Sequence, residues 1–177
     1  LQSIKDILYS RGESDFYNNA FKFSVVRNPW DRLVSQYQWR LAKGEKDVAD
    51  RPYKEWVKWR WENWLHWLEH PRKVIRGKAV LGHMDRAIVL THAFDTIYDD
   101  KEGKLLVDWI GRYENLREDF ETLCGKLKVD KDIVLPHKHN AKDRPHYTEF
   151  YDDETIEIVR KFYKNDIEVL GYKYGED

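Results

Sequence analysis

The sequence predicts an α/β fold formed as a single domain over residues 1–177. Two short stretches of β-branched and aromatic residues, which are typical of buried strands, each run directly into a segment with helical periodicity. Strand-then-helix units of this kind indicate a parallel sheet covered by helices. With 177 residues, of which 41% are hydrophobic, the chain is also long enough to bury a core.

The composition narrows the classes of partner. The 31 basic and 32 acidic residues leave a formal net charge of -1, so we expect no nucleic-acid partner and any anion site must be local. No apolar run approaches the roughly 20 residues that span a bilayer, and the first residues lack a signal-peptide pattern. One cysteine, Cys124, predicts a buried, inert thiol. The single cysteine and the absence of an Asn-x-Ser/Thr sequon suit a cytoplasmic location, and a membrane anchor upstream of Leu1 is the alternative.

The N-terminal part contains the first strand-then-helix unit. Residues 1–8 have the pattern of a helix end, and a polar loop is expected from there to Asn19. Residues 21–26 predict a short buried strand. Asn28 has the chemistry of a helix N-cap and Pro29 suits a first helical turn, so a helix is expected to start here.

The middle of the chain is predicted to be helical. The helix after Pro29 has one apolar face, formed by Trp30, Leu33, Val34, Tyr37 and Leu41. A charged loop over residues 42–52 leads to a second helix from residue 53 to about residue 69. Residues 72–82 allow no assignment.

The C-terminal part repeats the strand-then-helix pattern. Residues 104–116 predict a strand that runs into a helix, and the helix covers residues 112–127. Residues 135–147 form an expected loop rich in basic and imidazole side chains. Residues 152–172 predict a last helix, with Asp at its start and Gly171 as its stop signal.

Residues 25–35, VVRNPWDRLVS, combine the features of an anion site. Arg27 stands where the strand ends, and the N–H groups and dipole at the start of the next helix favour negative charge. The planar guanidinium suits a phosphate or sulfate, and Ser35 can donate a further hydrogen bond. The residues alone do not indicate which molecule carries the anion. A structural ion pair between Arg27 and Glu114 is the alternative.

The pattern Arg-Asn-Pro-x-Asp-Arg-x-Val-Ser-x-Tyr at residues 27–37 resembles the 3′-phosphate-binding motif of sulfotransferases that use 3′-phosphoadenosine 5′-phosphosulfate, or PAPS. Residues 102–120, 135–142 and 146–172 resemble further segments of the carbohydrate-sulfotransferase branch, in the same order. The resemblance implies a three-layer α/β fold with a central parallel sheet, related to P-loop kinases. It also implies transfer of a sulfuryl group to a hydroxyl of a carbohydrate acceptor, without a metal.

By this resemblance, Arg27 and Ser35 would hold the 3′-phosphate of PAPS, whose product is 3′,5′-ADP. Lys142 and Arg144 would belong to a basic loop that closes over the nucleotide. The family's N-terminal strand, its phosphate loop with a lysine, and its catalytic histidine have no match, so the catalytic residues are unknown and are expected upstream of Leu1. A non-catalytic nucleotide- or sugar-binding module that has lost the phosphate loop is the alternative.

Aromatic side chains suggest a weaker acceptor site, and two histidines raise the question of a metal site. Trp59 and Trp67 fall off the main apolar stripe of the helix after residue 53, where exposed rings could stack on the sugar of an acceptor. A second packing face explains them equally simply and is the more common arrangement. His137 and His139 lack a third ligand at suitable spacing, so no metal site is predicted.

Overall fold

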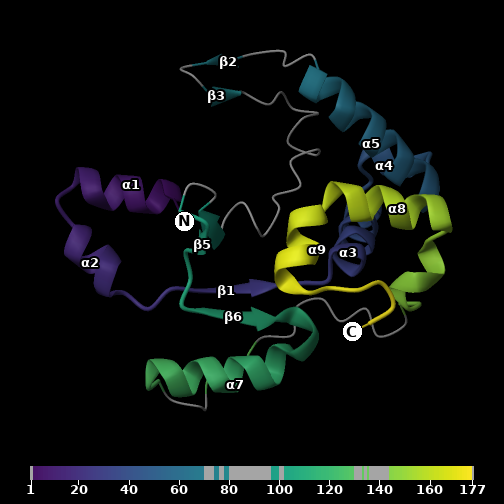
Figure 1. The fold of residues 1–177 in the computed structure, drawn as a ribbon. Coiled ribbons are helices and arrows are strands. Elements are labelled where there is room, and N and C mark those ends of the chain that lie inside the picture. Colours follow the sequence, from purple (N-terminus) through teal and green to yellow (C-terminus); the bar gives the residue numbers. More distant parts are fainter. Residues whose placement is uncertain are drawn as a thin grey trace. The chain divides into compact units, whose positions relative to one another are not determined.

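A computed structural model describes the larger part of the chain, with side chains masked at a few helical positions (Figure 1). The described residues are 2–69, 74–75, 78–79, 97–99, 102–129, 133, 135 and 144–176. Contacts between residues divide the chain into two units. The first comprises Leu1–Asn28, His92–Arg144 and Asp177, and the second comprises Pro29–Thr91 and Pro145–Glu176.

The first unit begins with two helices, α1 (Gln2–Ser10) and α2 (Ser14–Asn19). The helix predicted for the first residues is confirmed, but the loop predicted up to Asn19 is wrong in part. α2 forms because it packs on α1 and buries Tyr17, whose ring meets Tyr9 edge to face with the centroids 6.1 Å apart. A polar sequence pattern does not reveal such a single buried ring.

A parallel pair of strands is the centre of the first unit. β1 (Phe23–Val26) pairs with β6 (Trp109–Arg112), with Phe23 opposite Trp109 and Val26 opposite Arg112. Next to the start of β1, the backbone N–H of Lys22 donates to the Asp108 carboxylate at 2.7 Å. The parallel pairing and the helices confirm the prediction of an α/β fold.

Residues 104–116 were predicted to be a strand running into a helix, and the strand part is divided into two. β5 (Lys104–Leu105) pairs antiparallel with β4 (Tyr98–Asp99), whereas β6 pairs with β1. The division arises because the chain changes partner: the N–H of Leu106 donates to the carbonyl of Ile97, and the N–H of Asp108 donates to the carbonyl of Lys22. The short η2 (Tyr113–Asn115) follows, and then α7 (Leu116–Leu127), which packs on β6. Cys124 on α7 is buried, as predicted.

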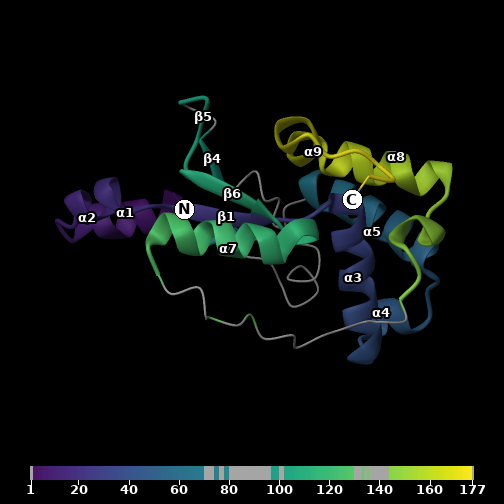
Figure 2. The same cartoon turned by 90° about the horizontal axis from the view of Figure 1, so that it is seen from below.

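The second unit is mostly helical (Figure 2). Its N-terminal part holds α3 (Pro29–Ala42), α4 (Lys46–Ala49) and α5 (Tyr53–Glu69), followed by the antiparallel strands β2 (Val74–Ile75) and β3 (Lys78–Ala79). Its C-terminal part holds η3 (Tyr147–Phe150), α8 (Asp153–Phe162) and α9 (Lys164–Leu170). The predicted helix start at Pro29 and the predicted helix from residue 53 to residue 69 are confirmed. α8 packs on both α5 and α3.

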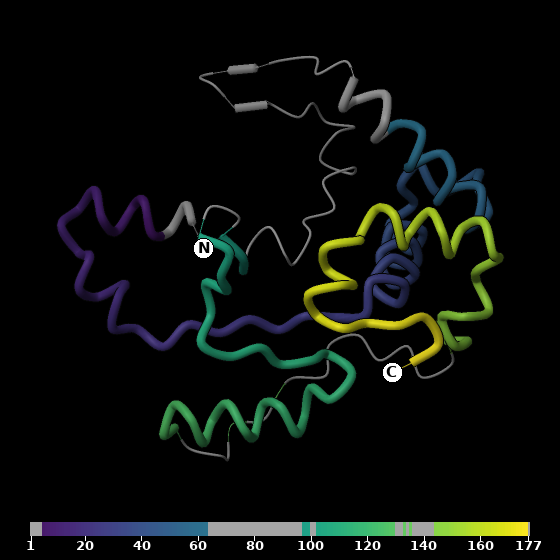
Figure 3. Tube along the Cα trace, in the orientation of Figure 1, coloured from purple at the N-terminus to yellow at the C-terminus, as the bar shows by residue number. Residues whose placement is uncertain are grey.

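The last predicted helix, residues 152–172, is two helices. Asp152 caps α8, because its carboxylate accepts from the Thr155 N–H at 2.9 Å, and Gly171 ends α9 with a φ of 69°. The chain bends between α8 and α9, as the tube in Figure 3 shows. Tyr163 lies between the two helices, and its N–H still donates to the carbonyl of Val159. The bend leaves the Tyr163 ring buried in the unit.

The prediction that one apolar face of α3 is buried is only partly correct. Four of the five side chains are buried: Trp30, Leu33, Val34 and Tyr37. The fifth, Leu41, is 46% exposed. Arg40 is buried beside it, because its Nε and Nη2 donate to the Asp47 carboxylate at 3.1 and 2.8 Å and Nη2 lies 2.6 Å from the Glu45 carboxylate.

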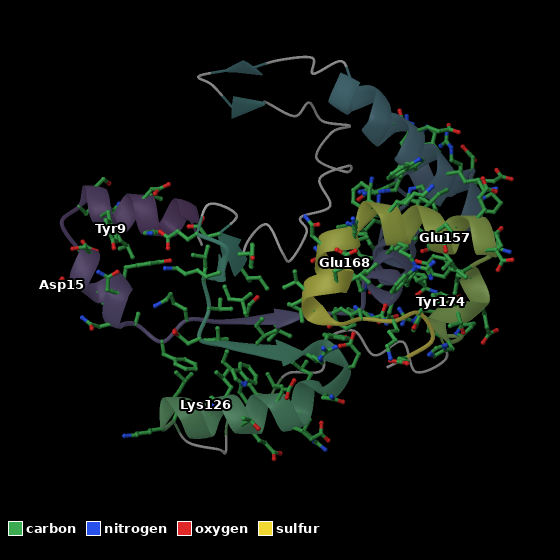
Figure 4. The ribbon with its side chains drawn as sticks, in the orientation of Figure 1. Tyr9, Asp15, Lys126, Glu157, Glu168 and Tyr174 are labelled. Atoms are coloured by element: carbon green, nitrogen blue, oxygen red, sulfur yellow. The ribbon has the colours of Figure 1, made fainter. Side chains whose placement is uncertain are left out.

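Tyrosine hydroxyls link the helices of the second unit. The Tyr151 hydroxyl donates to the carbonyl of Trp30 at 2.9 Å and accepts from the Tyr53 hydroxyl. Burial raises the pKa of both tyrosines well above the ordinary value, so both remain protonated donors. Tyr174, which Figure 4 labels, packs edge to face on Trp30 and Tyr151. Hydrogen-bonded aromatic residues therefore form much of this core.

Candidate functional site

Arg27 lies at the carboxyl edge of the parallel strand pair. It directly follows β1, and Tyr113 directly follows β6. Because the two strands are parallel and Val26 lies opposite Arg112, both following residues emerge at the same edge. The Arg27 guanidinium lies over the Tyr113 ring, with Cζ 4.2 Å from the ring centroid.

The contact with Tyr113 is a cation–π contact. A cation over an aromatic ring uses the face of the guanidinium. The N–H groups point outward in the guanidinium plane, where they can donate to two oxygen atoms of one anion. Half-buried Arg27 places a positive charge at this edge of the strand pair.

Two carboxylates fix the backbone at this edge. Glu114 accepts a hydrogen bond from the backbone N–H of Asn28, and Asp119 accepts one from the backbone N–H of Arg112. Asn28 is fully buried. Glu114 thus has a structural contact at the strand-to-helix junction of β1, which holds the chain immediately after Arg27.

Tyr113 is the functional candidate that the sequence analysis missed. The available signal was the position of Tyr113 directly after β6. If β6 pairs in parallel with β1, the residue after β6 must lie beside the residue after β1, which is Arg27. Recognising it requires the register of β1 and β6, and the sequence does not give that register.

Ser35 is described in the second unit and Arg27 in the first. Ser35 lies on α3 and is half-buried, one helical turn after the buried Asp31. Arg144 ends the described part of the first unit and is half-buried. Lys142 lies outside the described residues.

The two tryptophans predicted to bind an acceptor are on α5. Trp59 is half-buried, and the guanidinium of Arg51 lies over its ring with Cζ 4.7 Å from the centroid. One face of that ring is therefore covered by a cation. The backbone of Trp67 belongs to α5, but its side chain lies outside the described residues, as do His137 and His139.

No helix in the described part of the chain is long and apolar enough to cross a membrane.

A cation at the carboxyl edge of parallel strands, just before a helix, is typical of α/β proteins that handle anionic groups. The model of the sulfotransferase family matches residues 8–173, a span that includes parts of both units. The chain therefore belongs to the sulfotransferase family, whose members are transferases of sulfuryl groups. No curated protein and no solved structure matched the chain.

Proposed function

We propose that this protein transfers a sulfuryl group from PAPS to a hydroxyl of a carbohydrate and releases 3′,5′-ADP. Membership of the sulfotransferase family supports sulfuryl transfer to a hydroxyl-bearing acceptor. The observation that supports the choice of donor is the position of Arg27, whose guanidinium lies over the Tyr113 ring at the edge of the strand pair. A 3′-phosphate is what distinguishes this donor from other adenine nucleotides, and it is the group that Arg27 would bind.

In the proposed site, Arg27 donates two hydrogen bonds to the 3′-phosphate and Ser35 donates another through its hydroxyl. Lys142 and Arg144 add positive charge beside the nucleotide. The residues of this chain thereby orient the donor, and orientation can lower such a barrier by several kcal/mol. Tyr113 is a positioning residue, because it acts through Arg27.

The proposed reaction breaks the bond between sulfur and the oxygen of the donor's 5′-phosphate. A new bond forms between sulfur and the acceptor oxygen, whose proton passes to a general base. Negative charge grows on the leaving phosphate, and nearby cations stabilise it. This chemistry requires no metal. We assign no residue of this chain as the base.

The acceptor side of the proposal rests on Trp59 and Trp67. A sugar ring can stack on an indole, and in Trp59 the ring face opposite Arg51 is the one to which we assign the sugar. We also propose that residues 1–177 act as one sulfotransferase domain, since the family match includes residues of both units. The single cysteine is the reason for proposing a cytoplasmic location.

The proposed donor site is tested by isothermal titration of the protein with 3′,5′-ADP and with 5′-ADP. We expect the 3′-phosphorylated ligand to bind more tightly. Arg27→Ala should weaken only that ligand, by about 10- to 100-fold, as expected for loss of a charge-assisted contact. Ser35→Ala should have a smaller effect in the same direction. Equal affinity of the wild-type protein for the two nucleotides would rule out the site.

Catalysis needs a separate measurement. Radiolabelled PAPS and a panel of carbohydrate acceptors should give a labelled product that Arg27→Ala forms more slowly. Selective binding of 3′,5′-ADP without transfer to any acceptor would instead indicate a non-catalytic nucleotide-binding module.

A further inference from the structure

Trp39 on α3 is a tryptophan that faces solvent. The residue is 50% exposed. The other tryptophans whose burial the structure describes are buried or half-buried: Trp30, Trp56, Trp59, Trp61 and Trp109. An indole that remains in water keeps a broad, flat apolar surface that a ligand can cover. Within the described part of the chain, Trp39 is therefore the tryptophan that is most accessible to a ligand.

Trp39 shares one side of α3 with Ser35 and Lys43. Residues four positions apart lie on the same side of a helix, so Ser35 lies one turn before Trp39 and Lys43 one turn after it. Lys43 directly follows α3, and its N–H still donates to the carbonyl of Trp39 at 3.1 Å, which continues the helical turn. Ser35, Trp39 and Lys43 thus form a row along the helix, away from its buried face.

The direction of helical side chains brings the indole towards Ser35. Long side chains on a helix lean towards its N-terminus, so each one covers the turn before its own Cα. Lys43 has this direction, because its Nζ lies 5.1 Å from the centroid of the Trp39 ring. By the same rule, we expect the Trp39 indole to cover the turn that contains Ser35.

Lys43 adds a positive charge to this row. In the part of the chain that the structure describes, no carboxylate forms an ion pair with it. Arg40 on the same helix differs, because its Nη2 lies 2.6 Å from the Glu45 carboxylate and 2.8 Å from that of Asp47. The contact of an exposed cation with a ring is worth only about 0.5–1 kcal/mol, so an anion can draw the Lys43 ammonium to the rim of the indole.

The length of the donor limits what can bind beside Ser35. In PAPS, only one ribose and one phosphate separate the 3′-phosphate from the sulfuryl group. If Ser35 holds the 3′-phosphate, an acceptor that receives the sulfuryl group must lie about one nucleotide away from Ser35. Trp39 and Lys43, one and two turns further along α3, fall within that range.

We propose that Trp39 and Lys43 form a subsite for an acidic carbohydrate acceptor. The indole stacks on the apolar face of a sugar ring, and the ammonium pairs with the carboxylate of that sugar. This inference rests on the proposed function, because the donor at Ser35 is what makes a sugar at Trp39 an acceptor. The subsite is distinct from the stack proposed at Trp59, which lies on α5.

Nuclear magnetic resonance of the indole N–H groups tests the subsite without relying on turnover. The probes are methyl β-D-glucuronide and methyl β-D-glucoside, which differ only in carrying a carboxylate or a hydroxymethyl group. The Trp39 resonance is identified as the one that disappears in Trp39→Phe, or by backbone assignment if that variant does not fold. We expect it to shift to saturation over the millimolar range, with the glucuronide binding about 2- to 5-fold more tightly.

Three variants separate the stack from the charge. Trp39→Leu should weaken both probes by about 3- to 10-fold, because an apolar side chain without a ring cannot stack, and it should leave the affinity for 3′,5′-ADP unchanged. Lys43→Gln should abolish the preference for the glucuronide and leave glucoside binding unchanged. Lys46→Gln is the matched control, since it removes an exposed lysine of α4 and should change neither affinity.

The outcomes distinguish this subsite from the proposed donor site. A Trp39 resonance that follows neither probe overturns the subsite, and so does a shift confined to the Trp59 resonance. Equal affinity for the two probes overturns the acidic class of acceptor. Selective binding of 3′,5′-ADP without any sugar effect at Trp39 leaves the donor site intact. Saturation at Trp39 in a protein that binds 5′-ADP as tightly as 3′,5′-ADP supports the sugar subsite and refutes the donor assignment.

Discussion

Two arginines of this protein lie on aromatic rings at similar distances, yet their surroundings differ. Arg27 lies 4.2 Å from the Tyr113 centroid at the edge of the strand pair, and Arg60 lies 4.5 Å from the Trp56 centroid in the helical core. Arg27 is half-buried and Arg60 is buried. Both guanidinium groups contact an aromatic ring, but only the buried one loses its hydration, so burial determines how much its charge costs.

The carboxylates near the two arginines differ as well. In the helical core, Asp47 is an acceptor for charged side chains. At the sheet edge, Glu114 and Asp119 accept from backbone N–H groups. Removing a carboxylate should therefore cost more in the core than at the edge, because only in the core does it leave a buried cation.

The largest effect is expected for Asp47→Ala. This change removes an acceptor of Arg40 and a negative charge that acts on Arg60, so it should lower the free energy of unfolding by about 3–5 kcal/mol. Urea unfolding measures the loss. Glu45→Ala is the control, because this partner of Arg40 is more exposed and should cost much less. Equal losses in the two variants would contradict the assigned role of Asp47.

The pH dependence should come next in size. Burial alone would raise the pKa of Asp47, but the hydrogen bonds from Arg40 and Trp56 outweigh it and hold the pKa below the ordinary value. A lowered carboxyl pKa contributes stability above the unfolded-state value near 3.9 and loses it as pH falls through the folded-state value. Stability should thus fall below about pH 4, and Asp47→Ala should show a weaker acid dependence, measured by urea unfolding across pH.

Glu114→Leu should have an intermediate effect at the sheet edge. It removes the acceptor of the buried Asn28 N–H and should lower the free energy of unfolding by about 1–3 kcal/mol. Glu114→Gln keeps an acceptor oxygen and is expected to be close to wild type. A leucine variant as stable as the glutamine variant would show that this hydrogen bond does not hold the junction.

Tyr113→Leu is expected to have the smallest effect. Losing an exposed cation–π contact, worth about 0.5–1 kcal/mol, should weaken 3′,5′-ADP a few-fold and leave 5′-ADP unchanged. Tyr113→Phe should keep the affinity, because the ring remains. Titration of both nucleotides into Arg27→Ala/Tyr113→Leu completes the test: if Tyr113 acts through Arg27, the second change adds nothing. A loss of 5′-ADP affinity would mean that Tyr113 touches the nucleotide itself.

Local sequence signals predicted much of the fold. The change from β-branched residues to Asn28-Pro29 predicted where β1 gives way to α3, and the aromatic periodicity predicted α5. Gly171 predicted the end of α9, since it takes the positive φ that other residues avoid. These signals act within a few residues, so the sequence contains them in full.

Features that depend on packing between distant parts of the chain could not be predicted from such local signals. Arg60 lies one helical turn after the buried Trp56 and shares its face of α5, so it is buried although charged residues are ordinarily exposed. The stack of Arg27 on Tyr113 depends on strand register, and the bend at Tyr163 depends on where its ring packs. The role of Ser35 stays a prediction.

The order of the segments along the chain has a consequence for how the protein folds. Neither unit is a continuous stretch of sequence. In the first unit, the backbone N–H of Asn28 donates to Glu114, 86 residues later. In the second unit, the Trp30 carbonyl accepts a hydrogen bond from the hydroxyl of Tyr151, 121 residues later. Closing such long loops is slow compared with forming helices. During synthesis, helices such as α3 and α5 can form early, but the strand pair must wait for β6 and the helical core for α8. A nascent chain released before Tyr151 would therefore expose Trp30 and Tyr53 to aggregation.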